Sequence, residues 1–197
     1  MSNNKLIELR EDIISDFNGT VIDIETTGEF NDNRLYKIYN DSRRYESIQQ
    51  VILGLINRHG LKIFCAEGNE AINELAIRTK EIIEKLERPL YGFNVGCESS
   101  VWFHQLGITV IFDGELQKEK FESKASARRT LRIPNYDDPF DDRGYDCMKA
   151  WERGNFDQAI AHNRACLLKE RDILLKRGFR TPEKIQFNKS TSNVQST

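Results

Sequence analysis

Long hydrophobic runs are missing from this sequence. No apolar stretch approaches the roughly 18 residues that a membrane-spanning helix needs. The first residues, MSNNKLIELREDIISDF, are charged where a signal peptide would have an apolar core. We therefore expect a protein that does not enter a membrane and that resides in the cytoplasm.

Closely spaced cysteine pairs and a large excess of one charge are missing as well. None of the four cysteines belongs to a CxxC pair, so the sequence indicates neither a structural zinc motif nor a disulfide framework. We expect Cys65, Cys97 and Cys147 to be small buried side chains. The formal net charge is −2, although residues 118–132 hold six basic and two acidic residues. Such a segment is compatible with a local phosphate-binding face or with a solvated helix surface.

The pattern of apolar residues predicts one α/β domain within the 197 residues. Strand and helix signals follow the order β-β-β-α-β-α-β and then further helices, which favours a mixed sheet of about five strands flanked by helices. We expect an N-terminal helix over residues 1–18, the main domain over 19–180 and a polar, disordered tail over 181–197. Strands are also expected at RLYKIY (residues 34–39) and at ITVIF (residues 108–112).

Two acids mark the end of the first strand of this domain. In VIDIETTG, Asp23 and Glu25 are two positions apart, so both side chains point to the strand face that Val21 also occupies. Like charges beside apolar neighbours repel each other and lose solvation unless a cation lies between them. Carboxylate oxygens are hard ligands, which favours Mg²⁺ or Mn²⁺ over Zn²⁺. The alternative is an edge strand with two solvated acids.

This Asp-x-Glu-Thr-Thr-Gly stretch resembles the first motif of the DEDD (DnaQ-like) 3′–5′ exonucleases of the ribonuclease-H-like superfamily, and it is most similar to the YprB-type branch. The predicted element order is also the order of that fold, so the resemblance spans roughly residues 19–175. It implies phosphodiester hydrolysis with two Mg²⁺ or Mn²⁺ ions, which Asp23 would bridge and Glu25 would help to hold. The implied partner is a single-stranded or frayed end of DNA or RNA.

The second motif of this family is a strand that ends in Asn, followed four residues later by an Asp on the next helix. YGFNVGCESS places Asn94 and Glu98 at these positions, so a glutamate stands where the family has an aspartate. The resemblance implies that Glu98 is a catalytic metal ligand. Its extra methylene displaces the carboxylate by about 1 Å, however, and Mg²⁺ demands near-octahedral geometry. The alternative role of Glu98 is that of a first-turn acid favoured by the helix dipole.

The third motif is a His or Tyr followed by an Asp on a late helix. In IAHNRACLLKE, His162 matches the general-base position, where an imidazole orients or deprotonates the attacking water, and Cys166 aligns with the missing Asp. Three explanations stay open. Cys166 is itself a thiolate ligand, an acid such as Glu170 or Asp172 reaches the metal instead, or the fourth ligand is absent and the site is weakened.

Several polar residues near these motifs are candidates for contact with nucleic acid. They are Thr26, Thr27, Asn94, Arg128 and Arg129. For the two arginines an exposed basic helix face is an equal alternative, and we expect DDPFDD (residues 137–142) to be a solvated turn. The sequence thus favours a metal-dependent 3′–5′ exonuclease. The alternative is a nucleic-acid-binding or partner-binding module that keeps the fold and has lost hydrolysis.

Overall fold

The computed structural model of the chain describes residues 6–190, which form an α/β fold built on a mixed sheet of six strands. The strands lie in the order β1-β4-β3-β2-β5-β6. The central strand β2 pairs antiparallel with β3 and parallel with β5. The strands are β1 (Leu6–Glu11), β2 (Thr20–Thr27), β3 (Gln49–Asn57), β4 (Gly60–Ala66), β5 (Leu90–Gly92) and β6 (Gly114–Glu115).

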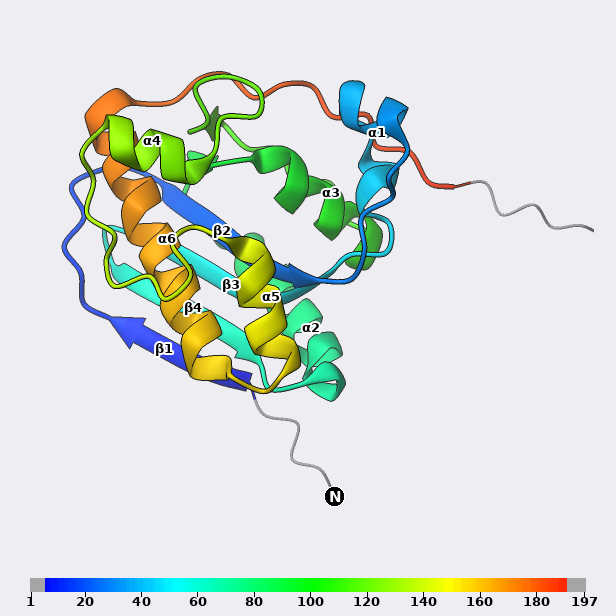
Figure 1. Cartoon of the computed structure of the whole chain (residues 1–197), viewed down its shortest axis with the longest axis horizontal. Helices are drawn as coiled ribbons and strands as arrows, with labels where there is room; N and C mark the ends of the chain where they lie inside the picture. The colour runs from blue at the N-terminus through cyan, green and yellow to red at the C-terminus, as the bar shows by residue number, and fades with distance from the viewer. Residues whose placement is uncertain (1–5, 191–197) are drawn as a thin grey trace, which may run out of the picture.

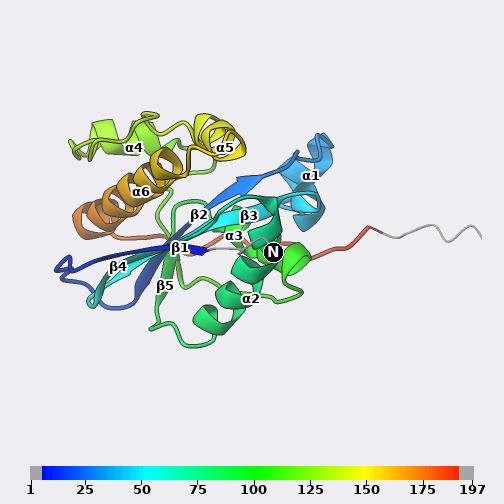
Figure 2. The ribbon, with the colours of Figure 1, turned by 90° about the horizontal axis from the view of Figure 1, so that it is seen from below.

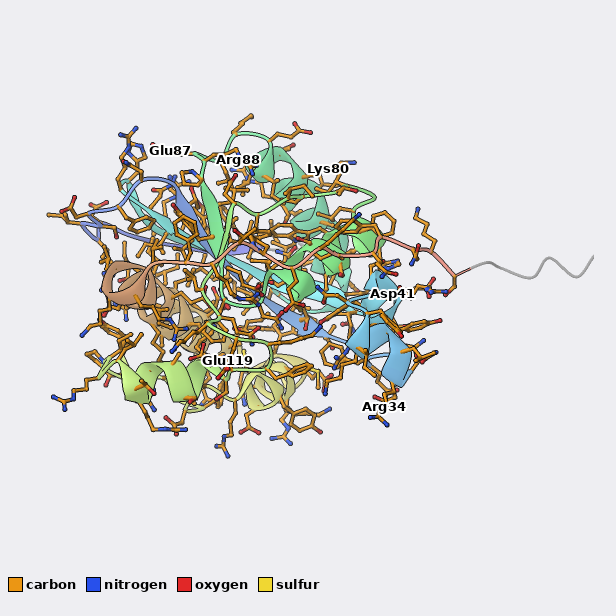
Figure 3. All side chains as sticks on the ribbon, turned by 90° about the horizontal axis from the view of Figure 1, so that it is seen from above. Arg34, Asp41, Lys80, Glu87, Arg88 and Glu119 are labelled. Atoms are coloured by element: carbon orange, nitrogen blue, oxygen red, sulfur yellow. The ribbon has the colours of Figure 1, made fainter. Side chains whose placement is uncertain are left out.

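Helices cover both faces of this sheet. They are α1 (Arg34–Ile38), α2 (Ile72–Ile83), α3 (Val95–Gln105), α4 (Lys124–Thr130), α5 (Gly144–Glu152) and α6 (Phe156–Arg177). Helix α6 crosses β2, β3 and β4, with α4 and α5 beside it (Figure 1), and α2 covers the opposite face (Figure 2). Figure 3 accordingly shows Lys80 and Arg88 on the α2 side and Glu119 on the α4 side.

No helix among residues 6–190 has both the length and the apolar content needed to cross a membrane.

The prediction of an N-terminal helix is wrong for the described residues. Residues 6–11 form the edge strand β1, antiparallel to β4, and residues 1–5 lie outside the described part. Ile7 and Leu9 pack against the core while Glu8 and Arg10 are exposed, which is the period of a strand. The sheet therefore gains one strand beyond the five that we expected.

Two further strand predictions are wrong. RLYKIY contains α1 instead of a strand, begun by Asn33, whose side chain accepts a hydrogen bond from the Leu35 amide. ITVIF forms no strand, and the last strand, β6, is two residues further on. In ITVIF, Val110 is buried and Ile111 is exposed, so the segment alternates like a strand without joining the sheet.

The beginning of the C-terminal segment is not the disordered tail that we expected. Gln186 forms a bridge with Asp41, and the Asn188 amide donates to the Ser42 hydroxyl at 3.0 Å. Residues 181–190 thus run along the short 3₁₀ turn at residues 42–45, while residues 191–197 lie outside the described residues.

Candidate metal centre

The acidic pair lies on the central strand, as the sequence predicts. Asp23 and Glu25 are 7% and 8% exposed and face α6. The β2–β3 register shifts between Glu25 and Thr26, where the strand ends its regular pairing. These acids are therefore buried in the middle of the fold, and the alternative of a solvated edge strand is wrong.

A glycine on β3 allows α6 to approach these acids. Gly54 is the register partner of Asp23, and a Cβ atom there would lie 2.0 Å from Asn163 Oδ1. Asn163 is fully buried, and its Nδ2 donates to Asp23 Oδ2 at 2.7 Å and lies 3.5 Å from Glu25 Oε1. The amide therefore fixes the orientation of Asp23. No role is predicted for Asn163 from the sequence, although it follows His162 directly.

His162 reaches the site from the same turn of α6. Its Nε2 lies 3.7 Å from Glu25 Oε1, and its Nδ1 lies 2.6 Å from Asp138 Oδ1. Burial lowers the pKa of His162, but interactions with Cys166, Glu25 and Asp138 outweigh it and raise this pKa to about 11. The imidazole is therefore cationic at neutral pH, which is not the state of a general base.

Part of DDPFDD is buried, so the prediction of a solvated turn is wrong. Burial raises the pKa of Asp138, but hydrogen bonds with His162 and Lys169 outweigh it and hold this pKa well below its usual value. The Lys169 ammonium lies 2.6 Å from both Asp138 and Asp142. This loop is thus tied to α6 by fully buried ion pairs.

Cys166 lies where the resemblance places the missing aspartate. Its Sγ is 3.7 Å from His162 Nε2, and it shares a cluster with Asp23 and Glu25 in which the donor atoms all lie within 4.8 Å of one another. Burial raises the pKa of the Cys166 thiol, so the side chain is neutral at pH 7. A thiolate ligand is therefore not preformed.

A lysine that the sequence analysis did not assign already lies among these acids. Lys124 Nζ is 2.8 Å from Asp23 Oδ1 and 2.6 Å from Glu170 Oε1. Burial lowers the pKa of Lys124, but Asp23, Cys166 and Glu170 outweigh it and raise this pKa well above its usual value. Glu170 thus reaches the site, as one alternative predicted, and binds a lysine there. Asp172 instead accepts a hydrogen bond from Tyr136.

Glu98 lies in the first turn of α3, buried, and its Oε2 has no hydrogen-bond partner in the described structure. Burial, followed by the charge of Asp23, raises the pKa of Glu98 well above its usual value. Burial also raises the pKa of Glu25 to about 7, with Asp23 contributing in the same direction. In the described residues, the close donor clusters include Asp23 and Glu25 but not Glu98. Glu98 is thus near Asp23 without sharing a ligand position with it.

Thr26 and Thr27 line a surface cleft of about 840 Å³ beside Glu25, and Thr27 Oγ1 donates to Glu152 at 3.1 Å. Asn94 is exposed and lines a separate cleft of about 360 Å³. These residues remain near the acids but face two different openings.

The two arginines of α4 differ. Arg128 pairs with Asp141 and Asp142, at 2.8 and 3.0 Å, so it is not the free phosphate contact that we considered. Arg129 is exposed. Other basic residues of this region are paired in the same way, as Arg177 is with Glu122. Much of the local positive charge is therefore neutralised within the fold.

Comparison with known proteins gives no relative from which a function could be transferred. No family model, no curated protein and no solved structure matches the chain.

The buried acids repel one another when they are charged, and a divalent cation bound among them would reduce this repulsion. Asp23, Glu25, Glu98 and Glu170 converge with one ammonium group and one imidazolium among them. Burial raises the pKa values of Glu25, Glu98 and Glu170, because each charged form loses solvation. A cation bound among them would favour the charged forms.

Proposed function

We propose that this chain is a metal-dependent nuclease with a ribonuclease-H-like fold, acting as a 3′–5′ exonuclease on the ends of DNA or RNA. One observation carries the proposal: Asp23 and Glu25 lie side by side and buried on the central strand, with the unpartnered Oε2 of Glu98 nearby. From β2 onward, apart from α1 and the short 3₁₀ turns, the strands and helices follow the order β-β-β-α-β-α-β before the last helices, which supports the proposal. The 3′–5′ direction rests on the resemblance alone.

Asp23, Glu25 and Glu98 would hold Mg²⁺ or Mn²⁺. When bound, the cations would stabilise negative charge on the phosphate and lower the pKa of a water molecule. Asn163 holds Asp23 through Oδ2 and so fixes the carboxylate in place. Asp138 fixes the imidazole of His162, whose Nε2 points toward Glu25. As a cation, His162 would donate a hydrogen bond from Nε2 to a phosphate oxygen.

The second candidate is a nucleic-acid-binding module without hydrolysis. Lys124 favours it, because its ammonium group already neutralises Asp23 from 2.8 Å. Cys166 favours it too, because a neutral thiol replaces a carboxylate ligand. The two candidates differ in one measurable respect, since only the nuclease shortens its substrate.

The test is incubation of 5′-end-labelled single strands and frayed duplexes with the protein and Mn²⁺. We expect stepwise shortening from the 3′ end in the native protein, loss of shortening in Asp23→Asn, and normal shortening in Asp157→Asn, which changes an exposed aspartate at the start of α6. Cys166→Asp restores an acid beside Asp23 and should increase the rate. Shortening that persists in Asp23→Asn would refute the assignment. Its absence from the native protein and from Cys166→Asp would favour the binding module.

A further inference from the structure

A second set of donor atoms remains beside the acids that Lys124 holds. Glu25 on β2, Cys147 on α5 and His162 on α6 each offer one donor atom, and these three atoms lie within 4.8 Å of one another. Cys166 Sγ lies 3.7 Å from His162 Nε2 and is a fourth donor on the same side. Three separate elements thus bring two sulfurs, one imidazole nitrogen and one carboxylate together.

His162 is oriented as a metal-binding histidine. In metal-bound histidines, the second ring N–H usually donates a hydrogen bond to a carboxylate, which fixes the tautomer and the direction of the ring. Here Nδ1 lies 2.6 Å from Asp138 Oδ1, and Asp138 is itself held by Lys169 at 2.6 Å. Nε2 is therefore the nitrogen directed at the sulfurs and at Glu25.

The contacts that α6 side chains make with the carboxylate of Glu25 are long. Its Oε1 lies 3.5 Å from Asn163 Nδ2 and 3.7 Å from His162 Nε2, both longer than an ordinary hydrogen bond to a charged group. Yet the residue is only 8% exposed. A buried carboxylate held so loosely is suited to bind a cation at this point.

We propose that Glu25, Cys147 and His162 bind Zn²⁺, with Cys166 as the fourth ligand, and that the two thiols and the His162 imidazolium release their protons when the ion binds. Thiolate sulfur and imidazole nitrogen are the donors that Zn²⁺ selects, whereas Mg²⁺ requires oxygen. Donor atoms around a tetrahedral zinc lie roughly 3.3–3.8 Å apart, and the donor atoms of Glu25, Cys147 and His162 lie within 4.8 Å of one another, so these three close on the ion with small side-chain movements. All four residues are buried, which shields the site from competing ligands.

This zinc site does not depend on the proposed hydrolysis, although the two share Glu25 and His162. It explains Cys166 and Cys147 together, which the magnesium arrangement leaves without a role. Cys147 is buried, as the sequence predicts, and the proposal gives this buried side chain a role as a ligand.

Co²⁺ is the probe for this site, because a cobalt–thiolate bond gives a charge-transfer absorption in the near ultraviolet that oxygen ligands do not give. We expect the metal-free, reduced full-length protein to bind one equivalent of Co²⁺ with this absorption. Zn²⁺ should displace the cobalt, and excess Mg²⁺ should not. Cys147→Ser should weaken Co²⁺ binding at least tenfold, and Cys166→Ser should reduce the absorption. Cys65→Ser should leave both unchanged, because Cys65 is equally buried on β4 but lies outside the cluster.

Circular dichroism identifies any variant that fails to fold, and His162→Gln then supplies an independent loss of a ligand. A folded native protein without thiolate absorption would overturn the proposal, and so would absorption that persists in a Cys147→Ser/Cys166→Ser double variant. Asp23→Asn separates this proposal from the nuclease. This variant should no longer shorten the labelled nucleic acid but should keep the cobalt spectrum. Each proposal can therefore fail independently of the other.

Discussion

Replacement of Lys124 by methionine should destabilise the protein strongly in the absence of metal. The ammonium group lies 2.8 Å from Asp23 and 2.6 Å from Glu170, and the Glu170 side chain has no exposed surface. Methionine keeps most of the side-chain volume and removes the charge. Loss of one partner from a buried ion pair typically costs about 3–5 kcal/mol, because the remaining charges stay buried without compensation.

For a chain of this length, such a loss lowers Tm by roughly 6–20 °C. Differential scanning calorimetry in the presence of a chelator measures it directly. Lys149→Met is the matched control, since Lys149 pairs with Glu152 at 2.8 Å on an exposed helix surface. An exposed pair contributes about 0–1 kcal/mol, so this control should change Tm by no more than a few degrees.

The same variant tests whether a cation can replace the lysine. In Lys124→Met, Mn²⁺ should raise Tm by more than it does in the native protein, because the acids around Asp23 have lost their competing ammonium group. An equal Mn²⁺ effect in both proteins would refute the view that Lys124 occupies the position of a metal ion. A Tm unchanged by the substitution would refute the ion-pair geometry itself.

Two further predictions concern the support of the site. Gly54→Ala forces a methyl group onto Asn163 and should cost about 1–3 kcal/mol by overpacking, measured by urea denaturation. Gly144→Ala, whose Cβ would meet nothing within 4 Å, should cost far less, and equal effects would contradict the close approach of α6. Burial raises the pKa of Glu25 from the ordinary 4.5 to about 7, so between these pH values only the folded state holds the proton and stability falls as the pH rises. With a chelator present, Glu25→Gln should remove on the order of 1–3 kcal/mol from the loss of stability between pH 5 and pH 7, so Tm should fall less over this range. An unchanged fall of Tm would show that other groups cause it.

The elements with strong local signals were predicted correctly from the sequence. The strands β2, β3, β4 and β5 are rich in apolar residues, and helix α2 has a clear apolar period. The errors lie where pairing with a distant partner decides the structure. The sequence of β1 has the pattern of an amphipathic helix, but in the structure it pairs with β4 and forms an edge strand. ITVIF has the pattern of a strand but pairs with no strand in the described structure.

The candidate site divides in the same way. Asp23 and Glu25 are two residues apart on one strand, so their common face follows from the sequence. Lys124 is far from both Asp23 and Glu170 along the chain, and nothing in the local pattern of α4 distinguishes it from the neighbouring basic residues. Asp138 looked solvated for the related reason that its buried partners lie on a helix more than twenty residues away. Burial of a charge is a property of the assembled fold.

Two features of the site change its charge in the same direction. A neutral thiol at Cys166 removes a negative charge that the resemblance expects beside Asp23, and Lys124 adds a positive charge at the same carboxylate. Each change weakens the attraction for a hard divalent cation, and sulfur beside His162 strengthens the attraction for a thiophilic one. Buried carboxylates destabilise a fold unless they are paired. Glu25 and Glu98 are buried, and Glu98 Oε2 is unpartnered in the described structure, so a cation bound beside them would offset that cost.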